Sequence, residues 1–204
     1  PNSGNAGTGS NNNSIGYASL SNNTTGANND AHGYGALQNT TTGSNNVAMG
    51  FQAGVSQTTG ASNVFIGTQA GYANINGGAL TFVGQGAGYN FNNTSNYGNT
   101  FIGQRAGYSV TSGYSNTFIG GNSSLTSDGS GSAVTTGKGN TIVGTFTGNQ
   151  NSINITTSDY NVILSDGAGY QRYWSNGSGN LQLYTTTSTT SQSAIIVNHN
   201  QSVG

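Results

Sequence analysis

Acidic and imidazole side chains, which hydrolytic enzymes use as acids, bases and nucleophile partners, are scarce in this sequence. The full supply is Asp30, Asp128, Asp159, Asp166, His32 and His199. Asp30 and His32 are two residues apart, which places them on one face of a strand, where they could orient a base or begin a metal site. We favour the alternative that His32 fills one position of a repeated apolar row. Because the sequence offers neither a carboxylate pair nor a nucleophile with its base, we predict no enzyme activity, no catalytic residue, no metal site and no cofactor.

Two glycine-rich motifs of ligand-binding proteins do not fit the sequence. The segment GQGAGY at residues 84–89 is similar to a phosphate-binding loop, which requires a helix directly after it. No helical spacing of apolar residues follows, and the same glycines recur along the chain, so turn geometry explains them. Calcium-binding β-rolls need an Asp in every repeat, and four Asp in 204 residues exclude such a site.

Three aromatic residues near the end of the sequence are the best binding candidates. Tyr170, Tyr173 and Trp174 lie among Asn and Gln residues. Exposed aromatic rings beside amides suit sugars, which offer apolar faces and many hydroxyl groups. The alternative, to which we give more weight, is that these rings form the core of a C-terminal region.

The overall composition does not support a thick hydrophobic core. Only 31% of the residues are hydrophobic and 3% are charged, and 35 of the 204 residues are Gly. A net charge of −1 together with 11 Tyr and 7 Phe is not typical of disordered chains, which favours a repeat fold with a thin core. The cations Arg105, Lys138 and Arg172 are far apart in sequence, so we expect no nucleic-acid partner. No apolar run approaches the ~20 residues of a spanning helix, so we expect no membrane insertion.

A repeat of about 17 residues organises most of the chain. Its clearest copy is GNTFIGQRAGY at residues 98–108. The central glycine of the copies forms an anchor row: Gly16, Gly33, Gly50, Gly67, Gly84, Gly103, Gly120 and Gly144. By subtraction, the steps between successive anchors are 17, 17, 17, 17, 19, 17 and 24, and in seven copies a second Gly precedes the anchor by seven positions. Units such as NTFIG alternate as strands do and are bounded by Gly and Asn turns, so we predict an all-β, parallel β-solenoid.

The repeated strand has two faces, and each carries a row of apolar residues. We predict that the row directly before the anchors stacks in the interior: Ile15, Met49, Ile66, Val83, Ile102, Ile119 and Val143. The row two residues before the anchors faces the other way and includes Phe65, Phe82, Phe101 and Phe118. Ordering a coil of ~17 residues costs roughly 1–2 kcal/mol of backbone entropy per residue, more than one thin row offsets. We therefore predict that the Phe row is the interface of a homotrimer.

A third row is complementary in size to the Phe row. Coils with Ser or Ala two residues before the anchor carry an aromatic residue after it, namely Tyr17, Tyr34 and Phe51. From this exchange we predict one continuous aromatic layer that is filled from alternating sites.

The repeat loses its phase after Asn149. Residues 1–149 are predicted to form the solenoid domain, with extra residues near 125–138 in a loop. Residues 150–204 are predicted to form a less regular β region, which holds the aromatic candidates and an apolar strand within 193–204. Because the sequence starts at Pro1 without Met, we expect it to be a processed piece of something longer.

The iterated N-T-x-I-G-x-x-A-G units resemble the repeat regions of phage tail fibres and related bacterial surface proteins. In those proteins a stretch similar to NVILSDGAGYQRYWSNGSGN, residues 161–180 here, often follows, and an endosialidase-type intramolecular chaperone commonly comes next. NNVAMG at 45–50 is similar to the N-S-V-A-I-G units of trimeric autotransporter adhesin heads, although the coils of those heads are shorter than the repeat found here. The resemblance covers residues 10–184 and implies a trimeric fibre of a virion or a cell surface.

Two functions of different classes follow from these observations. The first is a structural fibre segment of a phage tail fibre or surface adhesin, whose partners are copies of itself and a host-surface glycan or protein receptor. It would act by multivalent display of weak sites. The second is a monomeric ligand-binding solenoid such as an ice-binding protein, which needs an exposed Thr array. Thr81, Thr100, Thr117 and Thr141 recur once per coil, but Val47 and Val64 hold that position earlier, and we predict that this row lies inside.

Overall fold

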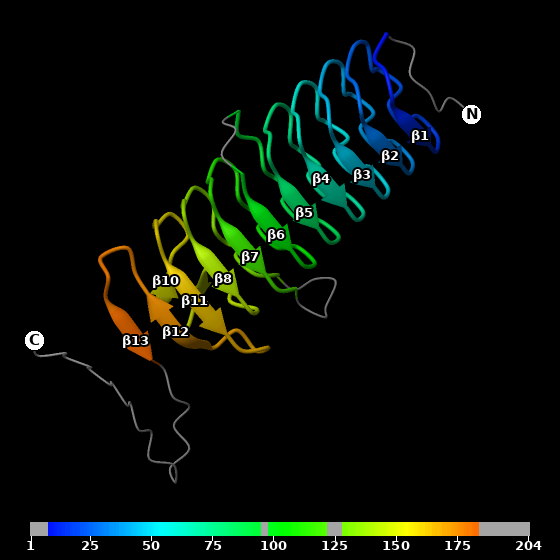
Figure 1. Cartoon of the computed structure of the whole chain (residues 1–204). Coiled ribbons are helices and arrows are strands. Elements are labelled where there is room, and N and C mark those ends of the chain that lie inside the picture. The colour runs from blue at the N-terminus through cyan, green and yellow to red at the C-terminus, as the bar shows by residue number, and fades with distance from the viewer. Residues whose placement is uncertain (1–7, 95–97, 122–127, 184–204) are drawn as a thin grey trace, which may run out of the picture.

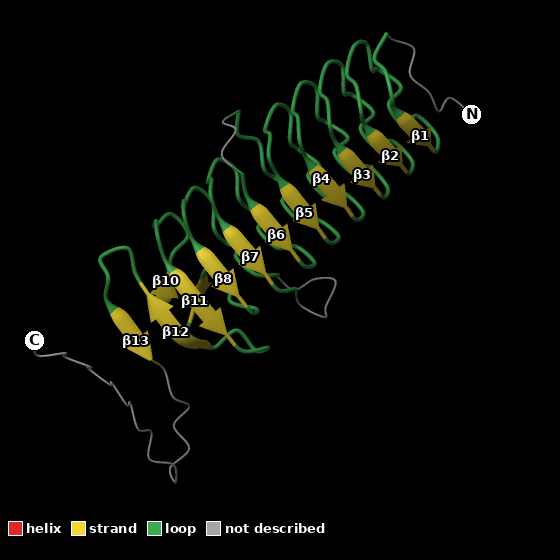
Figure 2. Ribbon diagram, in the orientation of Figure 1, coloured by secondary structure: helices red, strands yellow, loops and turns green. Residues whose placement is uncertain are grey.

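The repeats stack into a rod whose strands lie side by side along one face (Figure 1). The computed structural model describes residues 8–94, 98–121 and 128–183, and within these ranges it contains strands and turns but no helix (Figure 2). The strands are β1 (Asn13–Ile15), β2 (Asp30–His32), β3 (Val47–Met49), β4 (Val64–Ile66), β5 (Thr81–Val83), β6 (Thr100–Ile102), β7 (Thr117–Ile119), β8 (Thr141–Val143), β9 (Asn149–Gln150), β10 (Ile153–Asn154), β11 (Val162–Ser165), β12 (Gln171–Ser175) and β13 (Leu181–Leu183). The strand predicted within 193–204 lies outside the described residues.

Strands β1 to β8 form a parallel sheet in which each repeat pairs with the next in register. In the β6–β7 pair, for example, Thr100 lies opposite Thr117 and Phe101 opposite Phe118. The register survives the two longer steps between anchors, since Phe82 still pairs with Phe101 and Phe118 with Ile142. The predicted parallel β-solenoid of stacked repeat coils is therefore confirmed.

The sheet continues beyond the last anchor and then changes direction. Strand β11 pairs in parallel with β8, so coil stacking extends past residue 149. Strands β12 and β13 then add to the same sheet in antiparallel fashion, and β9 and β10 form a separate two-stranded hairpin. The C-terminal end of the solenoid is thus covered by a β-meander.

Backbone hydrogen bonds join successive coils on their other sides as well. Leu20 N donates to Ala36 O at 3.1 Å, and Thr41 N donates to Thr58 O at 2.9 Å, both outside the strands. The chain direction is the same in every coil, so each turn repeats the conformation of the turn beside it. Each coil is consequently held around much of its outline by the coils next to it.

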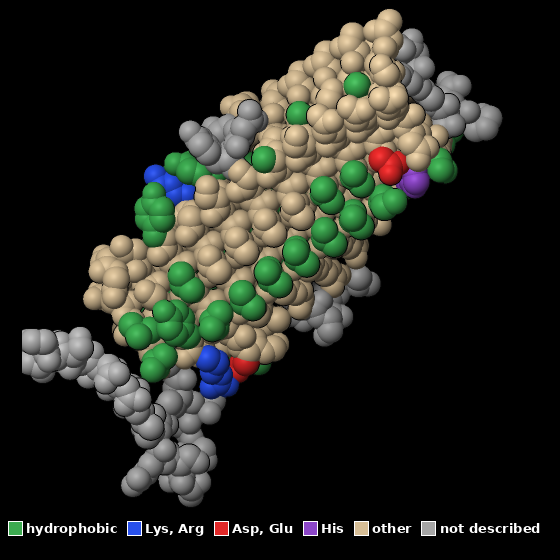
Figure 3. Space-filling view, in the orientation of Figure 1, with side chains coloured by type: hydrophobic (Ala, Val, Ile, Leu, Met, Phe, Trp, Pro, Cys, Tyr) green, Lys and Arg blue, Asp and Glu red, His purple; other side chains and the backbone are tan. Residues whose placement is uncertain are grey.

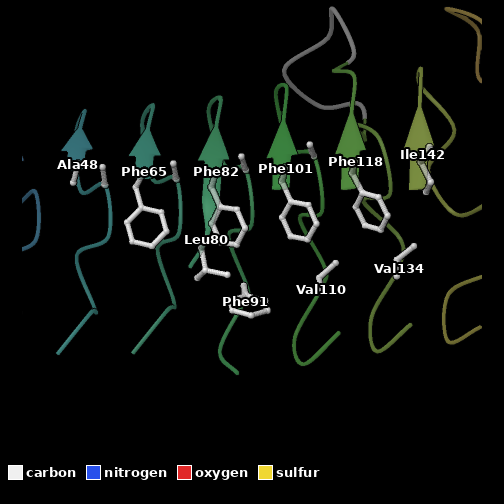
Figure 4. Close-up of a cluster of buried hydrophobic side chains, with 14 of the residues drawn as sticks. Ala48, Phe65, Leu80, Phe82, Phe91, Phe101, Val110, Phe118, Val134 and Ile142 are labelled. Carbon is white, nitrogen blue, oxygen red and sulfur yellow. The ribbon is translucent and has the colours of Figure 1, made fainter. Parts of the chain in front are cut away.

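The hydrophobic core is built from the Phe row, and the two predicted rows are therefore interchanged. Phe65, Phe82, Phe101 and Phe118 are completely buried within a single chain and point into the coils (Figure 4). Phe82 and Phe101 stack with ring centroids 4.9 Å apart, and Phe101 and Phe118 with centroids 5.0 Å apart. The prediction that this row forms a trimer interface is wrong, because no part of these rings is available to another chain.

The row predicted to be interior lies on the outside of the sheet. Ile15, Met49, Ile66, Ile102, Ile119 and Val143 are 36–57% exposed, and Val83 is half-buried. Strand alternation separates the two rows but does not say which one faces inward. The turn that follows each anchor decides this, because its small residues leave room for a ring inside the coil.

A glycine four residues after the anchor makes the space for the rings of Phe65, Phe82 and Phe101, and Gly131, eleven residues after its anchor, does so for Phe118. At Gly107 an added Cβ would lie 2.5 Å from Cδ2 of Phe101, and at Gly88 it would lie 2.5 Å from Cδ2 of Phe82. In the second coil the sizes are reversed, with a buried Ala31 in the Phe row and a buried Leu37 at the glycine position. Close packing therefore exchanges volume between these two positions.

The predicted aromatic layer does not form, because its members lie on different sides of the chain. Tyr17, Tyr34 and Phe51 are 46–56% exposed, whereas the Phe row is inside. They stack outside the core, with centroids 5.2 Å apart for Tyr17 and Tyr34 and 5.3 Å apart for Tyr34 and Phe51. The small Ser14 and Ala31 are instead matched by Leu20 and Leu37 four residues after their anchors, whereas the third coil has small residues at both positions, Ala48 and Gly54.

A buried row of asparagines runs beside the Phe rings and explains the second row of glycines. The Oδ1 atom of Asn116 accepts a hydrogen bond from the backbone N of Asn140 at 2.9 Å, and its Nδ2 atom donates to Gly137 O at 2.8 Å. The same pair of contacts links Asn46 to Asn63 and to Gly60. Because these buried amides are paired in the same way, the row fixes the register of one coil on the next.

Candidate functional site

The three predicted aromatic binding residues do not share one surface. Ile163 lies opposite Trp174 and Leu164 opposite Tyr173 in the β11–β12 pair. Since Ile163 is buried and Leu164 is exposed, Trp174 faces the core and Tyr173 faces outward.

Trp174 takes part in closing the C-terminal end of the solenoid. It packs against the buried cluster, and its Nε1 donates to Oδ1 of Asn161 at 3.2 Å. Tyr170 lies in the β11–β12 turn and is 53% exposed. A joint site of all three rings is not formed, and a binding role for Tyr170 and Tyr173 stays a prediction.

The turn that carries Tyr170 is organised by a carboxylate. The Oδ1 atom of Asp166 accepts backbone hydrogen bonds from Ala168 and Tyr170, each at 3.0 Å. Its Oδ2 atom accepts a hydrogen bond from Arg172, which forms an ion pair with it. Burial raises the pKa of Asp166, but the hydrogen bonds from Arg172, Tyr170 and Ala168 outweigh burial and hold that pKa below its ordinary value of 3.8.

Acidification is expected to loosen this turn. A carboxyl whose folded pKa is depressed stabilises the fold fully above its ordinary pKa of 3.8, and the stabilisation is lost as the pH falls through the lower folded pKa. The protection of the Ala168 and Tyr170 amides from exchange, relative to their intrinsic rates, should therefore fall below about pH 4. In Asp166→Asn the acid-dependent step in exchange should disappear, and an unchanged step in that variant would assign it to another group.

The Asp30–His32 pair lies at the N-terminal end of the sheet, on its outer side. Nε2 of His32 is 2.9 Å from Oδ1 of Asp30, and Nδ2 of Asn13 is 3.0 Å from each of these two atoms. His32 pairs in register with Ile15 and Met49, so it occupies the apolar row as expected from the repeat. In the described ranges no third His, Cys, Asp or Glu joins a pair to form a metal-binding group. The other histidine of the sequence, His199, lies outside those ranges.

The most extensive unexplained surface is the outer side of strands β3 to β8. We call it the outer sheet face and define it by twelve side chains: Val47, Met49, Val64, Ile66, Thr81, Val83, Thr100, Ile102, Thr117, Ile119, Thr141 and Val143. All are partly or largely exposed, and none is charged. Figure 3 shows the hydrophobic members as a row along the length of the rod.

The threonines of this face were predicted to lie inside, and that prediction is wrong. Thr81, Thr100, Thr117 and Thr141 are partly exposed, two residues before the outward Ile and Val residues on the same strands. They share the outer side because residues i and i+2 of a strand point the same way. From β5 to β8 the face therefore presents one Thr and one β-branched apolar residue per strand.

The stacked aromatic residues extend the apolar surface at the N-terminal coils. Tyr17, Tyr34 and Phe51 each follow an anchor glycine, two residues after Ile15, His32 and Met49. Their exposed rings stand where the later coils carry Thr68, Gln85 and Gln104. These rings thus carry exposed aromatic surface beyond β3 to the N-terminal coils, where the Asp30–His32 pair occupies the sheet itself.

The described part of the chain has no helix that is long and apolar enough to span a bilayer. Comparison with family models, with curated proteins and with solved structures finds no match to this chain.

Proposed function

We propose that this chain is a structural fibre segment, of the kind found in phage tail fibres or cell-surface adhesins, that assembles with copies of itself through the outer sheet face. The observation that carries the proposal is the uninterrupted row of outward apolar side chains over six successive strands. A contiguous exposed apolar patch of this kind marks an interaction surface in soluble proteins. The simplest assembly is a homotrimer on a virion or a cell surface.

A second copy of the chain fits the face better than an unrelated partner. Neighbouring strands of a sheet are ~4.8 Å apart, so side chains of one kind recur on the face at that interval. A parallel copy carries the same interval over the same length and can match the row coil by coil. The absence of charge among the twelve defining side chains removes like-charge repulsion between identical faces.

The energetics explain why the row must be long. Complete burial of an Ile side chain contributes about 1.5–3 kcal/mol, so the third of its surface still exposed is worth roughly 0.5–1 kcal/mol. Association costs about 4–15 kcal/mol in lost rotational and translational freedom. One or two coils cannot offset that cost, whereas the full row with its aromatic extension can.

Mutation of the outer sheet face is expected to abolish assembly. The 20.5 kDa chain should have three times its own mass in light scattering, and Ile102→Asp with Ile119→Asp should reduce it to one chain mass. Both residues are already 38% exposed in the single chain, so the monomeric variant should keep its β circular dichroism spectrum. The control Thr42→Asp with Thr136→Asp places the same charges on exposed turn positions and should leave the trimer intact.

A second function is favoured by the exposed threonines. Thr81, Thr100, Thr117 and Thr141 form a regular outward array beside an apolar row, as an ice-binding face would require. Light scattering and a measurement of thermal hysteresis together separate the two functions. A folded wild-type monomer contradicts the fibre proposal, and thermal hysteresis that disappears in Thr100→Lys would establish ice binding instead.

A further inference from the structure

A hollow lies on the solenoid where one column of side chains is interrupted. The column stands two residues after the anchors and reads Ala18, Gly35, Gln52, Gln69, Gly86 and Arg105 in chain order. Gly86 has no side chain, while its neighbours Gln69 and Arg105 have long ones. The gap measures about 190 Å³ and is lined by Gly86, Gln69, Gln85, Gln104, Arg105, Tyr89 and Tyr108.

One wall of the hollow belongs to a ladder of tyrosines. Tyr72, Tyr89 and Tyr108 stack with centroids 4.8 Å and 5.0 Å apart and ring planes within 2° and 12° of parallel. The guanidinium carbon of Arg105 lies 4.1 Å from the centroid of the Tyr108 ring. Since the rings cover one another's faces, the ladder offers its C–H edges and hydroxyl groups. Burial, followed by the neighbouring phenols of Tyr72 and Tyr108, raises the pKa of Tyr89, so its hydroxyl keeps its proton.

Apart from Arg105, the polar groups of the hollow are neutral hydrogen-bonding groups. Nε2 of Gln69 donates to Oε1 of Gln52 at 3.2 Å, which orients the Gln69 amide at the rim. Gln85 and Gln104 contribute two further amides, and Nε2 of Gln104 donates to Oε1 of Gln85 at 3.5 Å, which leaves the Gln85 NH₂ group and the Gln104 carbonyl oxygen for a ligand. The only cation of the lining, Arg105, forms an ion pair with Asp128 at 3.2 Å. An anionic ligand would therefore find no unbalanced positive charge here.

From this geometry we propose that the hollow binds one sugar ring of a neutral oligosaccharide. The amides of Gln69, Gln85 and Gln104 can exchange hydrogen bonds with hydroxyl groups, and the tyrosine edges can contact the C–H groups of the ring. At about 190 Å³ the hollow has room for a single ring, so a longer saccharide would extend along the rod. All the lining residues belong to one chain, so this site does not depend on the assembly proposed above.

The gap in the column provides a sharp test. Gln52 and Gln69 adopt φ of 54° and 57° in the same column, so a Gln is compatible with the left-handed backbone of Gly86, whose φ is 64°. A Cβ at Gly86 would make ordinary contacts of 3.5 Å and 3.6 Å with Tyr108 and Arg105. Gly86→Gln should therefore complete the column and fill the hollow without disturbing the coil. Gly35→Gln makes the same change three coils away and serves as the control.

Saturation-transfer NMR with lactose, maltose, cellobiose and diacetylchitobiose provides the measurement. At least one of these neutral sugars should bind to the wild type and to Gly35→Gln. Binding to Gly86→Gln should be weaker by about ten-fold or more, because the added side chain takes the space of the sugar ring. Gln85→Ala removes one lining amide from an exposed position, keeps the backbone unchanged and should weaken binding likewise.

Three outcomes would overturn the proposal. They are no binding of any sugar of the panel to the wild type, equal binding by the wild type and Gly86→Gln, or tighter binding of anionic sialyllactose than of lactose. Because the readout is made on each chain, a monomeric protein that binds sugar would contradict the fibre assembly and leave this site standing.

Discussion

Gly107→Leu is expected to destabilise the solenoid by at least about 3 kcal/mol, and adding Phe101→Ala is expected to recover much of that loss. A Cβ at Gly107 would lie 2.5 Å from the Phe101 ring, so the larger side chain forces the ring out of its place in the stack. Phe101→Ala alone should cost about 3–5 kcal/mol through the cavity that it leaves. The double variant reproduces the Ala31–Leu37 combination of the second coil, where Leu37 is completely buried at φ 49°.

Urea denaturation of the wild type, the two single variants and the double variant measures the coupling free energy between positions 101 and 107. The double variant should be more stable than the sum of the single effects by at least about 2 kcal/mol. The reverse exchange, Ala31→Phe with Leu37→Gly, is the matched control and should show coupling of the same sign. If the losses in the free energy of unfolding were additive at both pairs, 101 with 107 and 31 with 37, the two side chains of each pair would not compete for the same space.

Gly84→Ala is expected to break the rod between β5 and β6. The anchor backbone has φ of 129°, and an added Cβ would lie 2.5 Å from both the carbonyl carbon and the oxygen of Gly103 in the next coil. Since these are backbone atoms, no side-chain rotation relieves the contact, and the hydrogen bond of 2.7 Å from Gly103 N to Val83 O must lengthen. Together with the unfavourable φ, the expected loss is at least about 3 kcal/mol.

The measurement is the thermal midpoint together with amide exchange at Gly103. Gly167→Ala is the control, because a Cβ there meets no atom within 4 Å, and its stability should match the wild type. A wild-type midpoint and a protected Gly103 amide in Gly84→Ala would contradict this prediction, because they would show that the stack accommodates a Cβ at the anchor without cost.

The sequence allowed the period, the parallel stacking and the strand positions to be predicted, because the anchor glycines repeat in phase. It did not reveal which face of the strand is inside, since alternation is symmetric and both rows are apolar. The row of buried asparagines, which lies two residues before the Phe row, indicates which face of the strand is inside. Asn99 and Phe101 are two residues apart, so they face the same way, and both are buried. Reading each such Asn as a turn residue removed the signal that would have placed the Phe row inside.

The two candidate sites were harder to predict, for different reasons. The outward Ile and Thr residues follow the repeat and look like core residues until the inner row is known. The hollow exists because Gly86 interrupts a column that Gln69 and Arg105 continue, and the AGY segments at 70–72, 87–89 and 106–108 bring three tyrosines beside it. A search for departures from the repeat, column by column, would have located it.

The ladder hydrogen bonds between coils run along the length of the rod, and this direction has a mechanical consequence. We call the set of hydrogen bonds between two successive coils a rung. Tension applied to the two ends of a single chain loads the rungs one after another, so the end coil detaches before the next coils bear any force. Force applied across the rod loads many rungs at once. A fibre that has to transmit pull along its axis therefore gains little strength from a longer solenoid and much from chains joined side by side, because each lateral contact spans several rungs that would otherwise open in sequence.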